Sequence, residues 1–361
     1  MAGIKDIAEK ANVSIGTVDR VIHRRGRVAK ETIERVQRAM EELNYRPDIH
    51  ASNLSSGRRY RIAALIPELT QDSGFWGESA EGIRSAVSEL EQHRVDIEIY
   101  NYDEWNLASF GGSLDRALDD GADGLLIAPS TLTDRKTLFE RIPGDVPYVI
   151  CDSYIPGTNC ITYVGEDSYQ AGRTAGRLMA DMVANGPVVA LRSLPGTEHI
   201  GRRVQGFVDV ISERNQVRPL SIDFDSTMTD PQVDAFVGRL FFENPAIHGL
   251  FLSNSQINRI APAVLRHFKG ERPRMVGFDL VPANRDLLAN GSIDYLIGQR
   301  PEEQAYLGIQ ILYRHIAMHR RFPPEIIVPI DIICAENLGN YSTRLAVEEY
   351  AMTNPGDSAT G

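Results

Sequence analysis

The sequence predicts an all-α helix-turn-helix head followed by an α/β core with two doubly wound parallel-sheet subdomains. Short helical patterns with apolar residues three and four apart fill residues 4–44, and from Tyr60 onward short apolar runs alternate with amphipathic stretches. Alternation of strand and helix along a chain produces parallel sheets with helices on both faces. Nine apolar runs exceed the size of one comfortable sheet, so two sheets are expected.

The composition limits the classes of protein to which the chain can belong. Of 361 residues, 42% are hydrophobic and 24% are charged, which are ordinary values for a globular chain able to bury a core. No apolar run reaches 18 residues, and residues 1–10 interleave acids with bases, so neither a membrane span nor a secretory signal is expected. The three cysteines, Cys151, Cys160 and Cys334, are too scattered for a disulfide framework, which favours a cytoplasmic location.

The net charge of −11 is divided unevenly along the chain. Residues 1–60 hold 12 Lys and Arg against 8 Asp and Glu, whereas the remaining residues hold 26 against 41. A basic head is attracted to nucleic acid and an acidic body is repelled by it. Chance is the alternative explanation, because the excess in the head is modest.

The head begins with three short helices whose apolar positions repeat at helical spacing. These positions are Ile4, Ile7, Ala8 and Ala11 in the first helix, Ile15, Val18 and Ile22 in the second, and Ile33, Val36, Met40 and Leu43 in the third. Ser14 is a plausible N-cap of the second helix, and only residues 12–14 separate it from the first. Two short helices joined by such a tight turn form a helix-turn-helix, and the third helix completes its core.

The second helix has the features of a DNA-reading helix. It exposes Gly16, Thr17 and Arg20 when Val18 faces inward, and an arginine in the major groove can pair with guanine. The loop at 23–27 is rich in side chains that bind phosphate. A small helical interaction domain with a solvated basic loop remains the alternative.

The core pattern consists of short apolar runs separated by helical stretches such as Glu78–Glu91, Gln170–Val183 and Glu302–His319. The predicted strands are Ile62–Pro67, Val95–Tyr100, Gly124–Pro129, Val146–Asp152, Val188–Arg192, Leu220–Asp225, Gly249–Ser253, Arg274–Asp279 and Tyr295–Gln299. In open α/β sheets, ligands bind beyond the carboxyl ends of the strands. An aspartate after a strand is most often a helix N-cap. Polar or aromatic residues follow six of these strands, however, and together they favour one shared cleft.

The head resembles the lactose/purine-repressor (LacI-type) family of transcriptional regulators. The resemblance is carried by residues 4–8, 11–22 and 41–47, which match the family in order. It implies that Ile15, Gly16 and Arg20 read bases. It also implies a hinge helix near 48–56 in which Leu54 wedges into the minor groove. The full set of expected DNA-binding residues is Ser14, Ile15, Gly16, Thr17, Arg20, Arg24, Arg25, Asn53 and Leu54.

Three departures from the family pattern leave the operator sequence open. Asp19 stands where the family often has serine, and Gly16 has no side chain with which to read a base. Ser52 and Asn53 replace the longer or basic residues that are common in the hinge.

Residues 60–335 resemble the type I periplasmic sugar-binding fold that forms the effector core of LacI-type regulators. The phrases that carry this resemblance are 196–207, Asn254 after an apolar strand, and 276–279. It implies that Phe75 and Trp76 stack on a ligand. It further implies that the ligand forms hydrogen bonds with Asp152, Arg203, Asn254, Asp279 and Gln299. Ser73-Gly74 and Ser153 depart from the sugar-binding pattern.

The chemistry of this residue set suits a polyol. Carboxylates accept hydrogen bonds from neighbouring hydroxyls, a guanidinium offers paired donors, and aromatic faces cover the C–H face of a sugar ring. A neutral sugar or sugar derivative is therefore preferred as the effector. A nucleobase, a nucleoside and a sugar phosphate stay open.

Catalytic signatures are weak. The sequence has no Gly-x-Ser-x-Gly elbow, no phosphate-binding P-loop and no Gly-x-Gly-x-x-Gly. His315 and His319 share a helical face but lack a third zinc ligand, so surface histidines are the better interpretation. Asp152 and Asp279 could form a general acid/base pair, although paired acids in a sugar cleft more often bind. No enzymatic activity, cofactor or metal is expected.

These patterns predict a cytoplasmic regulator, most simply a repressor, that binds a palindromic operator as a homodimer and is allosterically controlled by a sugar-like effector. The expected domains are a head at 1–46, a hinge at 47–60, a core at 61–340 and a polar tail at 341–361. Within the core, one subdomain takes 61–163 and 296–325 and the other takes 164–295 and 326–340. The alternative is a cytoplasmic sugar-binding or sugar-processing protein without DNA function.

Overall fold

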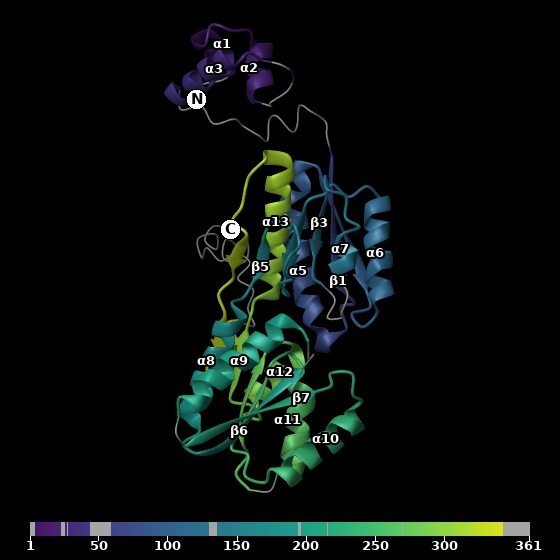
Figure 1. Ribbon diagram of the computed structural model, residues 1–361, viewed down its shortest axis with the longest axis vertical. Coiled ribbons are helices and arrows are strands. Elements are labelled where there is room, and N and C mark those ends of the chain that lie inside the picture. Colours follow the sequence, from purple (N-terminus) through teal and green to yellow (C-terminus); the bar gives the residue numbers. More distant parts are fainter. Residues whose placement is uncertain are drawn as a thin grey trace, which may run out of the picture. The chain divides into compact units, whose positions relative to one another are not determined.

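The computed structural model describes residues 4–22, 26, 28–43, 59–129, 136–193, 196–214, 216–268 and 270–341. The chain separates into two compact units, Met1–Arg59 and Tyr60–Gly361, and Figure 1 labels many of their elements. No helix within the described ranges is both long and apolar enough to cross a membrane. The predicted hinge up to residue 58 and the tail from residue 342 lie outside the described residues.

The first unit contains α1 (Ile4–Lys10), α2 (Ile15–Ile22) and α3 (Lys30–Glu42). Their buried core consists of the small and branched apolar residues Ile7, Ala8, Ala11, Val18, Val36 and Ala39. These positions lie on the apolar faces that the helical spacing defines, so the predicted helix-turn-helix with a third supporting helix is confirmed.

The turn between α1 and α2 follows from two residues. Asn12 has a φ of 50°, in the left-handed region that asparagine tolerates better than most residues. The Ser14 hydroxyl accepts a hydrogen bond from the backbone N–H of Thr17 at 3.1 Å. Ser14 therefore caps α2, as the sequence predicts.

The second unit contains two six-stranded sheets. The first sheet has the order β11-β5-β4-β3-β1-β2, and all of its pairs are parallel. Its strands are β1 (Tyr60–Pro67), β2 (Val95–Tyr102), β3 (Gly124–Ile127), β4 (Tyr148–Cys151), β5 (Tyr163–Gly165) and β11 (Glu325–Ile327).

The second sheet has the order β12-β10-β9-β8-β6-β7, and its pairs are parallel except for the antiparallel pair of β10 and β12. Its strands are β6 (Gly186–Ser193), β7 (Val217–Phe224), β8 (Gly249–Leu252), β9 (Arg274–Phe278), β10 (Tyr295–Gly298) and β12 (Asp331–Ile333). The prediction of two parallel sheets is confirmed, with this one antiparallel edge strand added.

Helices cover both faces of each sheet, as Figure 1 shows. The side chains of Ile62 and Ala64 on β1 pack in one apolar cluster, and those of Ala63 and Leu65 pack in another on the opposite face. The helices are α5 (Phe75–Leu90), α6 (Leu107–Asp119), α7 (Lys136–Phe139), α8 (Ser168–Met182), α9 (Glu198–Ser212), α10 (Asp230–Glu243), α11 (Ile257–His267), α12 (Pro282–Ala289) and α13 (Pro301–Met318). Short 3₁₀ turns occupy Asp72–Gly74, Glu91–His93 and Leu338–Tyr341.

The chain passes between the two sheets three times, after β5, after β10 and after β11. The expected subdomain boundaries lie a few residues from these crossings. All of Tyr163–Gly165 belongs to the first sheet, whereas Tyr295–Gly298 belongs to the second. Glu325–Ile327 returns to the first sheet by pairing with β5. The positions of these crossings are set by hydrogen bonds between strands, which the sequence pattern does not encode.

Two glycines permit α8 and α9 to approach each other closely. A Cβ on Gly172 would lie 1.9 Å from the carbonyl oxygen of Arg203, and one on Gly206 would lie 2.2 Å from that of Tyr169. Because backbone atoms form these contacts, no side-chain rotation relieves them. The helix that carries Arg203 is therefore positioned by the absence of a side chain at residue 172.

We expect Gly172→Ala to lower the free energy of unfolding by about 3 kcal/mol, since overpacking against backbone displaces a whole helix. Gly201→Ala on α9 is the matched control, because nothing lies within 4 Å of a Cβ at that position. That control is expected to stabilise the protein by about 0.5–1 kcal/mol through its better helix propensity. Urea denaturation measures both, and equal stability of the two variants contradicts the assigned helix contact.

Candidate functional site

The polar residues that follow the strands converge on one small cavity between the two sheets of the core. Asp152 follows β4, Asn254 follows β8, Asp279 follows β9 and Gln299 follows β10, while Arg203 lies on α9. All seven residues that the resemblance assigns to a ligand line this cavity: Phe75, Trp76, Asp152, Arg203, Asn254, Asp279 and Gln299. Five more lining residues were not predicted: Asp72, Glu104, Pro129, His199 and Ile200.

Arg203 is the centre of a buried hydrogen-bond network. Its Nε donates to Oε1 of Glu166 at 2.5 Å, and both side chains are almost completely buried. Its two terminal nitrogens donate to the carbonyl oxygen of Ser253 and to Oε1 of Gln299, each at 2.9 Å. The guanidinium also lies 4.2 Å from the centre of the Phe278 ring, within the range of a cation–π contact. These partners fix the side chain before any ligand arrives.

Gln299 extends the network to a second carboxyl group. Its amide nitrogen donates to Oδ1 of Asp279 at 3.0 Å, while its amide oxygen accepts from Arg203. The arrangement fixes which end of the Gln299 amide faces each neighbour. Asp279 is thereby tied to Arg203 through one intervening side chain.

Asp152 and Asp279 occupy unusual backbone positions. Their φ values are 66° and 67°, in the left-handed region that most side chains avoid. Each residue directly follows a buried strand, so the backbone turns sharply where the strand ends. Such conformations cost on the order of 1 kcal/mol or more and concentrate at functional sites. The two aspartates are thus held in place at the expense of local backbone strain.

Burial raises the pKa of each carboxyl group in the cavity wall. For Asp152, burial raises the pKa to about 7, with Asp72 and Glu166 adding to the rise and Arg203 opposing it. For Glu104, burial and then the neighbouring Asp72 and Asp152 raise the pKa well above its ordinary value. Burial likewise raises the pKa of Asp72 and of Asp279, and Arg203 opposes both rises.

Contacts at the cavity rim connect the two halves of the core. The Ser255 hydroxyl approaches the Asp72 carboxylate at 2.7 Å and the Asp72 carbonyl oxygen at 2.9 Å. On the other side, the Ser153 hydroxyl lies 2.8 Å from Nδ1 of His199. The enclosed cavity measures about 20 Å³, which is room for little more than one water molecule. A sugar-sized ligand enters it only if these rim contacts separate.

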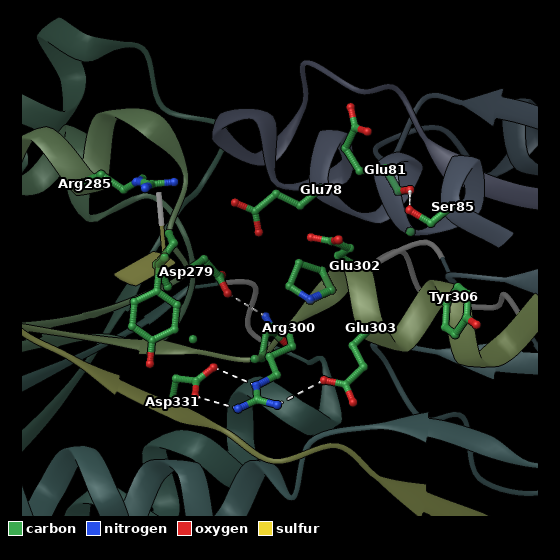
Figure 2. Close-up of a pocket in the computed structure, with 16 residues that line it drawn as sticks. Glu78, Glu81, Ser85, Asp279, Arg285, Arg300, Glu302, Glu303, Tyr306 and Asp331 are labelled. Atoms are coloured by element: carbon green, nitrogen blue, oxygen red, sulfur yellow. Dashed lines mark hydrogen bonds and ion pairs between the residues drawn. The ribbon is translucent and has the colours of Figure 1, made fainter. Parts of the chain in front are cut away.

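A larger groove lies beside the cavity and shares Asp279 and Gln299 with it. The groove has a volume of about 770 Å³ and is formed by α5, the start of α13 and the ends of β10 and β12 (Figure 2). Burial, together with the neighbouring Glu302, raises the pKa of Glu78 to about 7. Apart from the two shared residues, none of the predicted site residues lines this groove.

In the first unit, α2 presents part of the predicted DNA-reading surface. Ser14, Ile15, Gly16 and Arg20 are exposed, and Thr17 is half-buried. Ile15 is 50% exposed and does not belong to the apolar cluster of this unit. The remaining predicted DNA-binding residues, Arg24, Arg25, Asn53 and Leu54, lie outside the described residues.

The structure bears on one of the catalytic alternatives, a zinc site at His315 and His319. Nδ1 of His315 lies 2.9 Å from the carbonyl oxygen of Arg320, a local contact at the end of α13. Across the part of the chain that the structure describes, no group of three or more His, Cys, Asp or Glu side chains is arranged to hold a metal ion.

The fold and the cleft define a two-lobed binding protein joined to a helix-turn-helix head. Residues 62–319 match the periplasmic binding protein domain family, and residues 3–48 match the lacI family of bacterial regulatory proteins. The chain therefore belongs to the LacI-type regulators with a periplasmic-binding-protein core, as the resemblance implied.

Relatives agree with this assignment, and a solved structure agrees with the fold of the core. The ribose operon repressor of Halalkalibacterium halodurans is 27% identical over 80% of this chain and 83% of its own. The sucrose operon repressor of Streptococcus mutans is 23% identical over 94% of this chain and 100% of its own. A glucose-galactose binding protein from Geobacillus stearothermophilus shares the fold, with a TM-score of 0.69, 24% identity, and coverage of 78% of this chain and 99% of its own.

Proposed function

We propose that this protein is a dimeric transcriptional repressor in the cytoplasm that binds a palindromic operator and is controlled by a small polyhydroxylated effector. The observation that carries the proposal is the convergence of all seven predicted ligand residues on one cavity in a chain whose head matches the lacI family. The names of the relatives, which include repressors of ribose and sucrose operons, support a sugar or sugar derivative as the effector.

The cleft supports the proposal chemically. Asp152 and Asp279 accept hydrogen bonds from ligand hydroxyls, and Asn254 and Gln299 add an amide donor or acceptor. Phe75 and Trp76 supply apolar faces, with ring centres 4.9 Å apart and planes at 82°. Buried carboxylates, amides and aromatic rings together form the wall that a polyol requires.

Control of DNA binding follows from the rim contacts. Ligand binding changes the separation of Asp72 from Ser255 and of Ser153 from His199, and so changes the angle between the lobes. In a dimer, that angle sets the spacing of the two heads, and a palindromic operator accepts only one spacing. The coupling free energy equals the difference in ligand affinity between the two lobe arrangements.

Fluorescence anisotropy with the upstream DNA of the protein's own gene tests the proposal. We expect a complex whose affinity falls steeply with salt concentration, because phosphate contacts release counterions. Addition of the effector is expected to change the affinity by about 5- to 150-fold. Absence of a salt-sensitive complex, with and without a panel of sugars, contradicts the proposal.

We expect Arg20→Ala to weaken operator binding by about 10- to 100-fold, since an arginine paired with a base contributes about 1–3 kcal/mol of discrimination. Arg177→Ala is the matched control, because Arg177 is 67% exposed on α8 and forms an ion pair with the exposed Asp181. Both variants are expected to keep their affinity for the effector. Equal operator affinity in the two variants refutes the role of Arg20.

A further inference from the structure

The cavity wall is short of positive charge. Four carboxyl groups line it, from Asp72, Glu104, Asp152 and Asp279, whereas Arg203 supplies the one guanidinium among the lining residues that the structure describes. Arg203 is already matched by the buried carboxylate of Glu166, at 2.5 Å from its Nε. Arg203 also lowers the pKa of Asp72, Asp152 and Asp279, but one cation paired with Glu166 does not offset the burial of all the lining carboxyl groups.

The four carboxyl groups come from different elements and meet only in the folded protein. Asp72 lies in the turn after β1, Glu104 follows β2, Asp152 follows β4 and Asp279 follows β9. Each is buried or largely buried, and neighbouring carboxyl groups act on Glu104 and Asp152 as well as burial. Several like charges in a low-dielectric cavity are unfavourable, so these carboxyl groups keep protons, as their raised pKa values indicate, and ionise when a counter-charge joins them.

The aromatic wall beside Glu104 suits a cation as well. Trp76 is 3% exposed and lines the cavity together with Glu104. Phe75 packs edge-on against it. Aromatic faces attract ammonium groups through the ring quadrupole. Carboxylates and aromatic rings together form the usual surroundings of a bound amine.

We propose that the effector is a hydroxylated cation, a polyol that carries a protonated amine, such as an amino sugar or an aminocyclitol. The ammonium group lies among Asp72, Glu104 and Asp152 against Trp76, and the hydroxyl groups face Arg203, Asn254 and Gln299. Phosphorylated and carboxylated sugars are disfavoured, because they would add a negative charge to this wall. The inference rests on the proposed function only in taking the cavity as the effector site.

Isothermal titration calorimetry on the full chain tests the inference with matched sets of compounds. Each set contains a sugar, its 2-amino derivative and its N-acetylated derivative in the glucose, galactose and mannose series, and myo-inositol is paired with an inosamine. In at least one set, we expect the amine to bind tenfold or more tightly than both its hydroxyl parent and its acetylated form. The inference is overturned if, in every set, the hydroxyl parent binds as tightly as its amine. It is also overturned if no amine in the panel binds at millimolar concentration.

Glu104→Gln isolates the charge from the shape of the wall. We expect it to reduce the preference for the amine over its hydroxyl parent by about tenfold, while a loss of shape alone would weaken both ligands equally. Glu91→Gln removes the same charge from an exposed position and is expected to leave the preference unchanged. Thermal unfolding verifies that both variants are folded, and an unchanged preference in folded Glu104→Gln overturns the inference.

The experiments separate this inference from the proposed function. If a neutral sugar binds and changes operator affinity, the function stands and the cationic effector is refuted. If an amine binds with the expected preference but leaves operator affinity unchanged, the ligand class stands and the regulatory function is refuted.

Discussion

Replacing Arg203 with methionine is expected to lower the free energy of unfolding of the core by about 3–5 kcal/mol, because the change leaves a buried carboxylate without its counter-charge. Glu166 is completely buried and accepts from Nε of Arg203 at 2.5 Å. The carbonyl oxygen of Ser253 and Oε1 of Gln299 lose their donors as well. Urea denaturation at pH 7 measures the loss.

A double variant separates the unpaired charge from the lost packing. Arg203→Met combined with Glu166→Leu leaves no buried charge without a partner, so it is expected to recover much of the stability that Arg203→Met alone loses. Arg177→Met provides the surface comparison, because Arg177 and Asp181 are 67% and 52% exposed at 3.0 Å and such pairs contribute about 0–1 kcal/mol. A double variant no more stable than the single one shows that packing dominates at this position.

The elements that the sequence predicts well are those buried on both faces. β3, β4 and β8 are four-residue strands in which every residue is buried, so they read as continuous apolar runs. β5, β11 and β12 were not predicted, because each has only three residues and too few positions to establish a period. These strands form because distant partners supply hydrogen bonds, and no local pattern records those partners.

The site residues that the sequence predicts are likewise those that follow a recognisable strand. Asp152, Asn254, Asp279 and Gln299 were predicted because each directly follows a strand that the sequence reveals. Glu166 follows β5, which was not predicted, so nothing marked it as the partner of Arg203.

The sequence pattern indicates two acids of the cavity wall less clearly as site residues. Asp72 and Glu104 follow β1 and β2 at the same sheet edge, but they lie in polar stretches that read as ordinary surface loops. Glu68 directly follows β1 and Asp103 directly follows β2, so a rule that selects the first residue after each strand finds neither Asp72 nor Glu104. Their burial, which gives the cavity its excess of carboxyl groups, arises only from tertiary convergence.

Replacing Asp152 with asparagine is expected to stabilise the ligand-free protein above pH 7 and to weaken effector binding. Burial raises the pKa of Asp152 from 3.8 to about 7 in the folded state, so the folded protein retains a proton that the unfolded chain has lost. The stability that this proton contributes is complete below about pH 4 and is lost as the pH rises through 7. At pH 8 the ionised carboxylate therefore costs up to about 4 kcal/mol, which asparagine avoids.

The groups that face Asp152 set the size of this effect. Arg203 from α9 lowers its pKa, while Asp72 and Glu166 raise it, and His199 approaches the neighbouring Ser153. Asparagine also tolerates the φ of 66° at this position, so backbone strain does not change. Asp286→Asn on the exposed face of α12 makes the same chemical change outside the cavity and is expected to shift stability by less than about 0.5 kcal/mol.

The difference in unfolding free energy between the natural protein and Asp152→Asn is expected to grow between about pH 4 and pH 7 and then level off. Effector affinity is expected to fall by about 10- to 100-fold, because a charge-assisted hydrogen bond becomes a neutral one. A residue that only supports the fold would lose stability and affinity together. If Asp152→Asn gains stability and loses effector affinity, the burial of Asp152 weakens the fold but serves ligand binding. A variant that is less stable than the natural protein at pH 8 contradicts that assignment.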